Sequence, residues 1–341
     1  MAVPANVADI RFARQTAGQG TPIAAPTATD YGLFVAGGSM IRPNRVDEPF
    51  EETTGGQMRS DRYVSTIHAE GEPEFYLMPK SAAAMLYGVL GAKAVSGAGD
   101  PWTHTLTFGS SRPWWTVWRA LGGLIFERFP DCKFDRIAIR SEYGKPATIT
   151  ARIIGLNAQW ASAAEAQPTI EVTHRIMHAD AVAAFMVEGA AVASTREFEI
   201  VIDRNGDPVG GDDYRPIDIF EGEFTVQVTL GQLYLANSLR NRLMYGGASP
   251  ADNTSVVSAI LELAGAPAGI QVLYTRGGSV PVSPARSIQI NVPRVALAPI
   301  EPEHATGSEP LRQTVTVNAL QPAAAATPMT CVVKNGESTI A

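Results

Sequence analysis

The sequence predicts a mainly β fold flanked by two or three short helices. Glu72–Met78 and Glu223–Leu230 alternate apolar and polar residues, which is typical of strands with one buried face. Trp102–Trp160 is a series of β-branched and aromatic runs separated by Gly and Pro, typical of successive strands joined by short turns. The 341 residues show no fixed-period repeat. They are enough for one large all-β domain or two smaller ones.

The N-terminal part is less regular. Residues 1–30 are rich in Ala, Pro, Thr and Gly, so we expect a flexible arm that a neighbouring molecule must hold in place. Tyr31–Val35 is a short apolar run that predicts a first strand. Residues 36–62 form a polar, Gly-rich segment that is long for a loop in a compact domain. Two interpretations stay open here: a disordered surface loop, or an extended arm or hairpin that docks on a neighbouring subunit.

A short helix and a tryptophan-rich strand region follow. We expect Ser81 to cap the helix and Gly91 to end it, since Gly readily adopts the left-handed conformation of a helix C-terminus. The apolar face of this helix would consist of Met85, Leu86, Val89 and Leu90. Four of the five tryptophans then fall between Trp102 and Trp118. Clustered tryptophans more often pack in a core or an interface than form a stacking platform for bases or sugars. A platform that binds single-stranded nucleic acid would also have Lys and Arg between its aromatic residues.

The second half of the chain predicts further strands and two helices. Leucines at positions 235, 239 and 243 repeat at helical spacing, and Val256–Leu263 forms another such stripe that ends at Gly265. Residues 204–207 are a tight-turn sequence. The remaining strands are expected in a hairpin around Gly189 and at Phe198–Ile202, Ile270–Thr275, Ser287–Val295, Leu311–Ala319 and Met329–Val333.

The amino-acid composition excludes some classes of function. The formal net charge is −7 and charged residues make up 18% of the chain. An acidic balance argues against a general nucleic-acid clamp, which needs a basic stripe. Cys132 and Cys331 are expected to be buried thiols in a reducing compartment. The start of the sequence is not typical of a signal peptide, and the most apolar window, Ala181–Ala193, is shorter than a membrane span of ~20 residues. We therefore expect a soluble protein made in the cytoplasm.

No catalytic, cofactor or metal site is predicted. The sequence has no phosphate-binding loop, no dinucleotide fingerprint and no nucleophile elbow. His174 and His178 are four residues apart, so they would share a helix face and could hold a metal, but the expected companion ligands are missing. The interpretation that we favour is a polar face. A long chain with many amphipathic strands and no reactive cluster indicates a building block rather than an enzyme.

One acidic motif lies at residues 203–207. Asp203, Asn205 and Asp207 resemble the opening of a calcium-binding loop. The glycine that such a loop needs is replaced by Pro208, and Tyr214 stands where the final carboxylate belongs. A β-turn with exposed acidic residues is therefore predicted.

The order of several motifs resembles the phage tail tube protein family of long-tailed bacteriophages, prophages and gene transfer agents. The resemblance covers most of residues 63–333. It is carried by the Glu72–Met78 strand, the helix after it, residues 104–109, Pro113 with its aromatic strand, residues 132–134, Thr148–Leu156, the hairpin around Gly189, residues 222–226, the Leu-rich helix, residues 288–295 and a Val-Thr-Val-Asn-Ala strand.

This resemblance implies a tail-tube-type β-sandwich or barrel whose subunits form rings, usually hexameric, that stack into a hollow tube conducting phage DNA into the host cell. The implied partners are copies of the chain, a tape measure protein, a tail terminator, distal-tail proteins and double-stranded DNA that passes without specific binding; no membrane is implied. The implied location is the virion tail, assembled in the bacterial cytoplasm. The expected domain organisation is an N-terminal arm and long loop at 1–62 ordered by neighbouring subunits, a tail-tube β domain at 63–333 in which 161–270 could hold an insertion or subdomain, and a C-terminal tail at 334–341.

A channel for a polyanion should not be adhesive, so we expect Asp and Glu to outnumber Lys and Arg on the strands that line it. The Glu223–Leu230 strand, with its Thr and Gln face, is a candidate for the lining.

Two other classes of protein stay open. One is a different virion β-protein, such as a tail terminator, a distal-tail or baseplate ring protein, or a capsid decoration protein. The other is a carbohydrate-binding β-sandwich or an enzyme that uses the tryptophan cluster.

Overall fold

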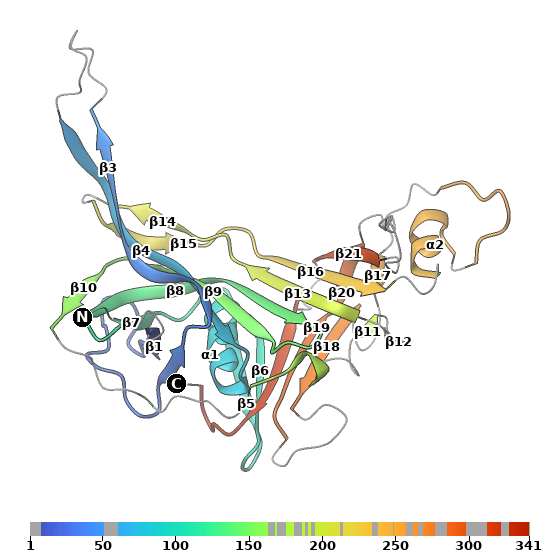
Figure 1. The fold of residues 1–341 in the computed structure, drawn as a ribbon, viewed down its shortest axis with the longest axis horizontal. Coiled ribbons are helices and arrows are strands. Elements are labelled where there is room, and N and C mark those ends of the chain that lie inside the picture. The colour runs from blue at the N-terminus through green and yellow to red at the C-terminus, as the bar shows by residue number, and fades with distance from the viewer. Residues whose placement is uncertain are drawn as a thin grey trace, which may run out of the picture.

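The computed structural model describes most of the chain. The described residues are 8–50, 61–162, 168, 175–180, 186–187, 190–191, 195–211, 214–233, 238–247, 249–256, 262–264, 269–276, 285–297, 312–321 and 327–340. They form two antiparallel sheets, a separate two-stranded hairpin and a few short helices (Figure 1). The predicted mainly β fold is confirmed. No helix in this part of the chain is long and apolar enough to cross a membrane.

The larger sheet contains 13 of the strands described. Its main path runs β17-β20-β21-β16-β13-β8-β7-β1-β2, while β9 joins β8 to β4, and β3 and β10 complete it. The members are β1 (Ala8–Arg14), β2 (Tyr31–Phe34), β3 (Gly37–Pro49), β4 (Arg62–Tyr76), β7 (Trp115–Leu121), β8 (Ile125–Glu142), β9 (Thr148–Gly155), β10 (Gln159–Ala161), β13 (Thr195–Asp203), β16 (Thr225–Leu233), β17 (Glu262–Ala264), β20 (Arg294–Leu297) and β21 (Arg312–Ala319).

The smaller sheet has seven described strands in the order β12-β11-β18-β19-β22-β6-β5. These are β5 (Gly91–Ser96), β6 (Trp102–Phe108), β11 (Met186–Val187), β12 (Ala190–Ala191), β18 (Ile270–Thr275), β19 (Ser287–Val292) and β22 (Thr330–Asn335). The hairpin outside both sheets is β14 (Asp207–Gly210) with β15 (Pro216–Phe220), and the helical segments are α1 (Pro79–Leu90), α2 (Ser238–Tyr245) and the 3-10 turn η1 (His178–Asp180). The C-terminal segment is anchored to this sheet, since Ile340 is buried and its carbonyl oxygen accepts a hydrogen bond from Lys93 Nζ.

Helix α1 packs against β8 of the large sheet and against β5, β6 and β22 of the small one. All its residues except Lys80 are buried, because sheets flank it instead of solvent. Gly91 ends it with a φ of 94°, as predicted. The predicted cap at Ser81 is wrong: Met78 is the N-cap residue, and Pro79 starts the helix because its fixed φ and missing N–H suit the first turn.

An aromatic cluster lies at the centre of the core. Phe12 stacks on Tyr31 with ring centroids 5.0 Å apart, and the rings of Phe12 and Trp115 each meet Phe134 edge-on at 5.4 Å. Trp115 is fully buried, which agrees with the core interpretation of the tryptophans. Trp160, in contrast, is 76% exposed.

The N-terminal expectations need correction. Residues 8–14 are not a loose arm but strand β1, which lies between β2 and β7, with Ile10 and Phe12 in the core. Residues 37–49 form β3, which pairs with β4 over a hairpin that extends away from the rest of the molecule (Figure 1). The hairpin interpretation is thus confirmed over the loop interpretation, while docking on a neighbour stays a prediction. Residues 1–7 and 51–60 lie outside the described part.

In the second half, the predicted strands and the hairpin around Gly189 are present. The helix predicted from the leucine spacing is α2, although residues 234–237 lie outside the described part. The helix predicted over Val256–Leu263 is wrong at its end, because residues 262–264 are β17, paired with β20; residues 257–261 are not described. Cys132 and Cys331 are buried free thiols, and burial raises the pKa of both.

Candidate functional site

The large sheet has one apolar and one polar face across β4, β9, β8, β13, β16 and β21. Side chains that point inward from these strands are in the core, and those that point outward are half-buried or exposed. The inward set includes Phe75, Ile149, Ile137, Ile139, Ile200, Ile202, Val226, Val228, Val315 and Val317. The outward set is almost entirely polar, and we call it the polar face.

One half of the polar face is neutral over the side chains that the structure describes. These outward side chains on β16 and β21 are Thr225, Gln227, Thr229, Thr314, Thr316 and Asn318. Gln227 lies opposite Asn318 in the strand register, and its Nε2 donates to Asn318 Oδ1 at 3.5 Å. This is the Thr and Gln surface that the sequence predicts for Glu223–Leu230.

The other half is charged and acidic. Within residues 70–76 of β4, 136–142 of β8, 148–152 of β9 and 197–203 of β13, the outward side chains include seven carboxylates and three guanidinium groups, which the strand pairing places on one surface. These are Glu70, Glu72, Glu74, Glu142, Glu197, Glu199 and Asp203 against Arg136, Arg140 and Arg152. Carboxylates therefore outnumber arginines by more than two to one here.

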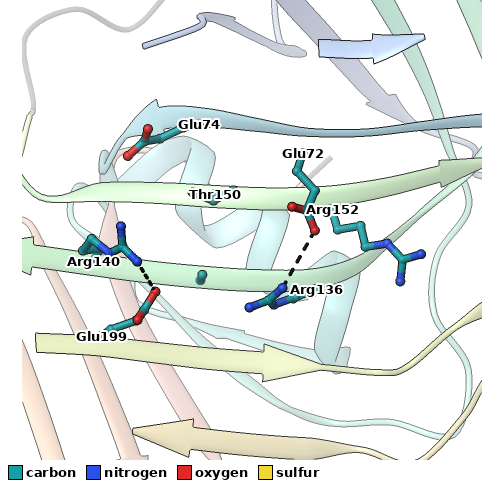
Figure 2. A pocket seen from close by; sticks show the side chains of 8 residues that line it. Glu72, Glu74, Arg136, Arg140, Thr150, Arg152 and Glu199 are labelled. Atoms are coloured by element: carbon teal, nitrogen blue, oxygen red, sulfur yellow. Dashed lines mark hydrogen bonds and ion pairs between the residues drawn. The ribbon is translucent and has the colours of Figure 1, made fainter. Parts of the chain in front are cut away.

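Each arginine of this face lies beside a carboxylate. Arg140 and Glu199 are direct register partners, and Arg140 Nη2 donates to Glu199 Oε1 at 2.9 Å (Figure 2). Arg136 lies between Glu72, 3.9 Å from its Nη1, and Asp203, 3.8 Å from its Nε. The ion pairs line a shallow hollow between β4 and β13 (Figure 2).

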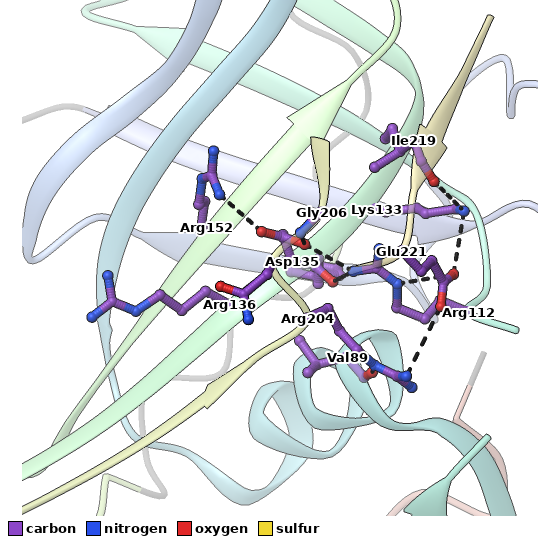
Figure 3. A network of polar contacts seen from close by, with 12 residues as sticks. Val89, Arg112, Lys133, Asp135, Arg136, Arg152, Arg204, Gly206, Ile219 and Glu221 are labelled. Atoms are coloured by element: carbon purple, nitrogen blue, oxygen red, sulfur yellow. Dashed lines mark hydrogen bonds and ion pairs between the residues drawn. The ribbon is translucent and has the colours of Figure 1, made fainter. Parts of the chain in front are cut away.

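Arg152 connects this surface to the protein interior. Its Nη2 lies 2.7 Å from Glu70 Oε1 and its Nη1 lies 2.9 Å from Asp135 Oδ2. Asp135 occupies an irregularity in the pairing of β8 with β9, where Phe134 pairs with Ile153 and Arg136 with Arg152. The bulge turns the Asp135 side chain out of the regular alternation and into a buried network (Figure 3).

The buried network fixes the base of the β14–β15 hairpin. The fully buried side chains of Arg112 and Asp135 form an ion pair at 3.3 Å, and Arg112 Nε lies 3.1 Å from Glu221 Oε1. Gly206 N donates to Asp135 Oδ1 at 2.8 Å, so the turn before β14 is tied to the same carboxylate. Burial raises the pKa of Asp135, although Arg112, the Gly206 N–H and Arg152 oppose that rise.

A second arginine of the network reaches the C-terminal end of α1. Arg204 Nε donates to the Val89 carbonyl oxygen at 2.8 Å, and its Nη2 donates to the carbonyl oxygens of Leu90 at 2.8 Å and Gly109 at 3.0 Å. These bonds satisfy carbonyl groups that a helix end leaves without partners. Burial lowers the pKa of Arg204 to about 10, so it remains charged at neutral pH.

The hairpin covers one end of the polar face. Ile219 of β15 packs on Ile154 and Leu156, with Trp114 beside them. Lys133 Nζ donates to the Ile219 carbonyl oxygen at 3.3 Å. Burial lowers the pKa of Lys133, while Glu221 opposes that change. The hairpin thus covers the large sheet beyond Arg152 by apolar packing, and it leaves the charged residues of the polar face uncovered.

The residues that the sequence singled out do not converge. His174 is not among the described residues, and His178 is buried, with its Nδ1 2.7 Å from Ser141 Oγ. The described residues contain no cluster of three or more His, Cys, Asp or Glu that could hold a metal ion. The 203–207 segment is a turn in which Asp203 Oδ1 accepts from Asn205 N at 2.8 Å, and Asn205 has a φ of 48°.

Sequence reasoning missed the arginine–carboxylate pairs and the role of Asp135. The pairs join residues that are 59 to 82 positions apart, for example Arg140 with Glu199 and Arg152 with Glu70. Only the strand register brings them together. Alternation of charged residues on β8 and β13 marks an outward face but does not reveal its partners.

A comparison with protein families decides the kind of protein. The model of a family described as phage tail tube protein matches residues 5–319. The chain belongs to the phage tail tube protein family. It is therefore a structural protein of the phage tail, and its sheet-rich fold is consistent with the β-sandwich that the resemblance to this family implies. A search of curated proteins found no match to the chain.

Proposed function

We propose that this tail tube protein assembles with copies of itself into rings, that the rings stack into a hollow tube, and that the polar face lines the channel through which double-stranded DNA passes. The single observation that carries the proposal is the two-faced sheet with its acidic outer surface. A sheet with one face in the core must present the other to solvent or to a partner.

The margins of the large sheet support assembly. Strand β3 pairs only with β4 among the described residues, and it is 13 residues long. A long edge strand carries backbone N–H and C=O groups that can pair with another chain. Copies arranged around an axis would join such margins into a closed barrel, and a different face would stack one ring on the next.

The charge of the polar face supports conduction. DNA carries a dense row of phosphates, and proteins retain it mainly through Lys and Arg contacts. On the neutral half, the outward side chains that the structure describes on β16 and β21 include no such cation, and the charged half carries an excess of carboxylates. A duplex moving along this surface would meet few groups able to hold it.

Negative-stain microscopy of the purified protein tests assembly. Rings or long tubes are expected; compact single particles at every concentration would contradict the proposal. Small particles that bind only to capsids would indicate a decoration protein.

A labelled variant tests which face lines the channel. In Gln227→Cys, a gold-maleimide label should appear along the tube axis in averaged images. The unsubstituted protein is the control, because its two thiols are buried and burial raises their pKa. Label on the outer wall of the tube would contradict the assignment of the polar face to the lumen.

A further inference from the structure

We propose that carboxylates of the polar face shield its arginines from DNA phosphates, and that Glu199 is the main shielding residue. This inference rests on the proposed function. It adds a specific role for the ion pairs: the arginines lie on the channel surface, and their carboxylate partners keep them from binding the DNA.

Arg140 is the guanidinium that most needs a shield. Its side chain is 66% exposed, and it projects from β8, which is separated from the neutral strands only by β13. Its partner Glu199 is 31% exposed and lies directly across from it on β13. The register continues to Thr229 and Thr316, which carry no charge. Without Glu199, this row would present an exposed guanidinium to the channel.

The other two arginines have two carboxylates each. Arg136 lies between Glu72 and Asp203, and Arg152 lies between Glu70 and the buried Asp135. Loss of one carboxylate would leave each of them with a partner. Arg140 differs, since Glu199 is its one ion-pair partner within the part of the chain that the structure describes.

Local pairing, rather than the total charge, should decide adhesion. Salt screens exposed charges beyond about 8–10 Å, so distant carboxylates protect a guanidinium poorly. An unpaired Arg binds phosphate bidentately, and each such contact releases counterions. Exposed ion pairs contribute little to the stability of a fold, so stability alone does not explain why these pairs are present.

The test compares two variants with the same change in charge. Glu199→Gln removes the shield of Arg140. Glu74→Gln removes a carboxylate of the same face that makes no ion pair among the described residues, so it frees no arginine. Assembled tubes and dissociated subunits of each are mixed with short double-stranded DNA, and retention is measured by co-sedimentation and by fluorescence anisotropy at about 50 mM and about 200 mM salt.

We expect Glu199→Gln to bind DNA at least about tenfold more tightly than the unsubstituted protein at low salt, the effect of one added charge-assisted hydrogen bond. The gain should shrink at the higher salt concentration. Glu74→Gln should behave as the unsubstituted protein, and adding Arg140→Gln to Glu199→Gln should abolish the gain. If Glu199→Gln fails to fold, Glu72→Gln with Asp203→Asn, which frees Arg136, replaces it.

Equal DNA binding by the Glu199→Gln and Glu74→Gln proteins would overturn the inference, because net charge would then be sufficient. No gain in Glu199→Gln would also overturn it. These failures differ from failure of the proposed function, which would show as an unsubstituted protein that forms no rings, or as a label at position 227 on the outside of the tube.

Discussion

Substitution of Gly88 by Ala tests how tightly α1 is held against the large sheet. A Cβ atom at position 88 would lie 2.5 Å from Phe134 Cδ2 and 3.1 Å from Phe134 Cγ. Contacts below 3.0 Å require something to move. The Phe134 ring is fully buried and meets Phe12 and Trp115 edge-on at 5.4 Å, so it has little room to turn away.

Two opposing effects set the magnitude. Ala is favoured over Gly in a helix interior by about 0.5–1 kcal/mol. Insertion of a carbon into a close-packed core costs typically about 1–3 kcal/mol. Because the neighbouring rings confine Phe134, we expect the packing cost to win, and the free energy of unfolding should fall by about 1–2 kcal/mol.

Urea unfolding of dissociated subunits, followed by tryptophan fluorescence, measures this change. A double-mutant cycle with Phe134→Leu supplies the control, since a smaller side chain at 134 relieves the clash. The double variant should be less destabilised than the sum of the two single variants. If Gly88→Ala alone stabilises the subunit by about the helix-propensity gain, the ring is free to move and this reasoning is wrong.

Two further predictions concern the buried network and the tryptophans. Burial raises the pKa of Asp135, so the folded protein binds this proton more tightly than the unfolded chain. Its contribution to stability is therefore full below the unfolded pKa, near 3.8, and is lost as pH rises through the folded pKa. The unfolding free energies of the unsubstituted protein and of Asp135→Asn can be measured by urea titrations at several pH values. The value for the unsubstituted protein minus that for Asp135→Asn should fall as pH rises from about 4. A difference that does not change with pH would exclude this linkage. Trp115→Ala should cost about 3–5 kcal/mol and Trp160→Ala less than about 0.5 kcal/mol in the same assay, since one ring is buried and the other exposed; similar costs would contradict the core assignment.

Local sequence patterns predicted the strands whose two faces differ in polarity. Phe198–Ile202 and residues 223–230 alternate as expected, because one face packs on the core and the other does not. Strand β1 escaped prediction for a physical reason. Its Asp9 and Arg11 are both buried and form an ion pair at 2.8 Å, so a strand with a paired neighbour on each side has polar residues where apolar ones are expected.

The candidate site could be predicted only in part. The neutral Thr and Gln surface of β16 follows from the alternation of a single strand. The pairing of Arg140 with Glu199 depends on the register between β8 and β13, which no local pattern encodes. The position of Asp135 depends on a bulge in β8, and it is stabilised by Arg112 from a distant loop.

The pairing of strand β8 limits where the sequence can gain or lose residues. This strand pairs with β7 and β13 along one margin and with β10 and β9 along the other. Side chains in a strand switch sides at every residue. Deletion of a single residue near Ile137 would therefore exchange core and solvent positions in the C-terminal part of the strand and break its match to two neighbours at once. Changes in chain length between relatives should accumulate in the loops around this strand and be nearly absent within Ile125–Glu142.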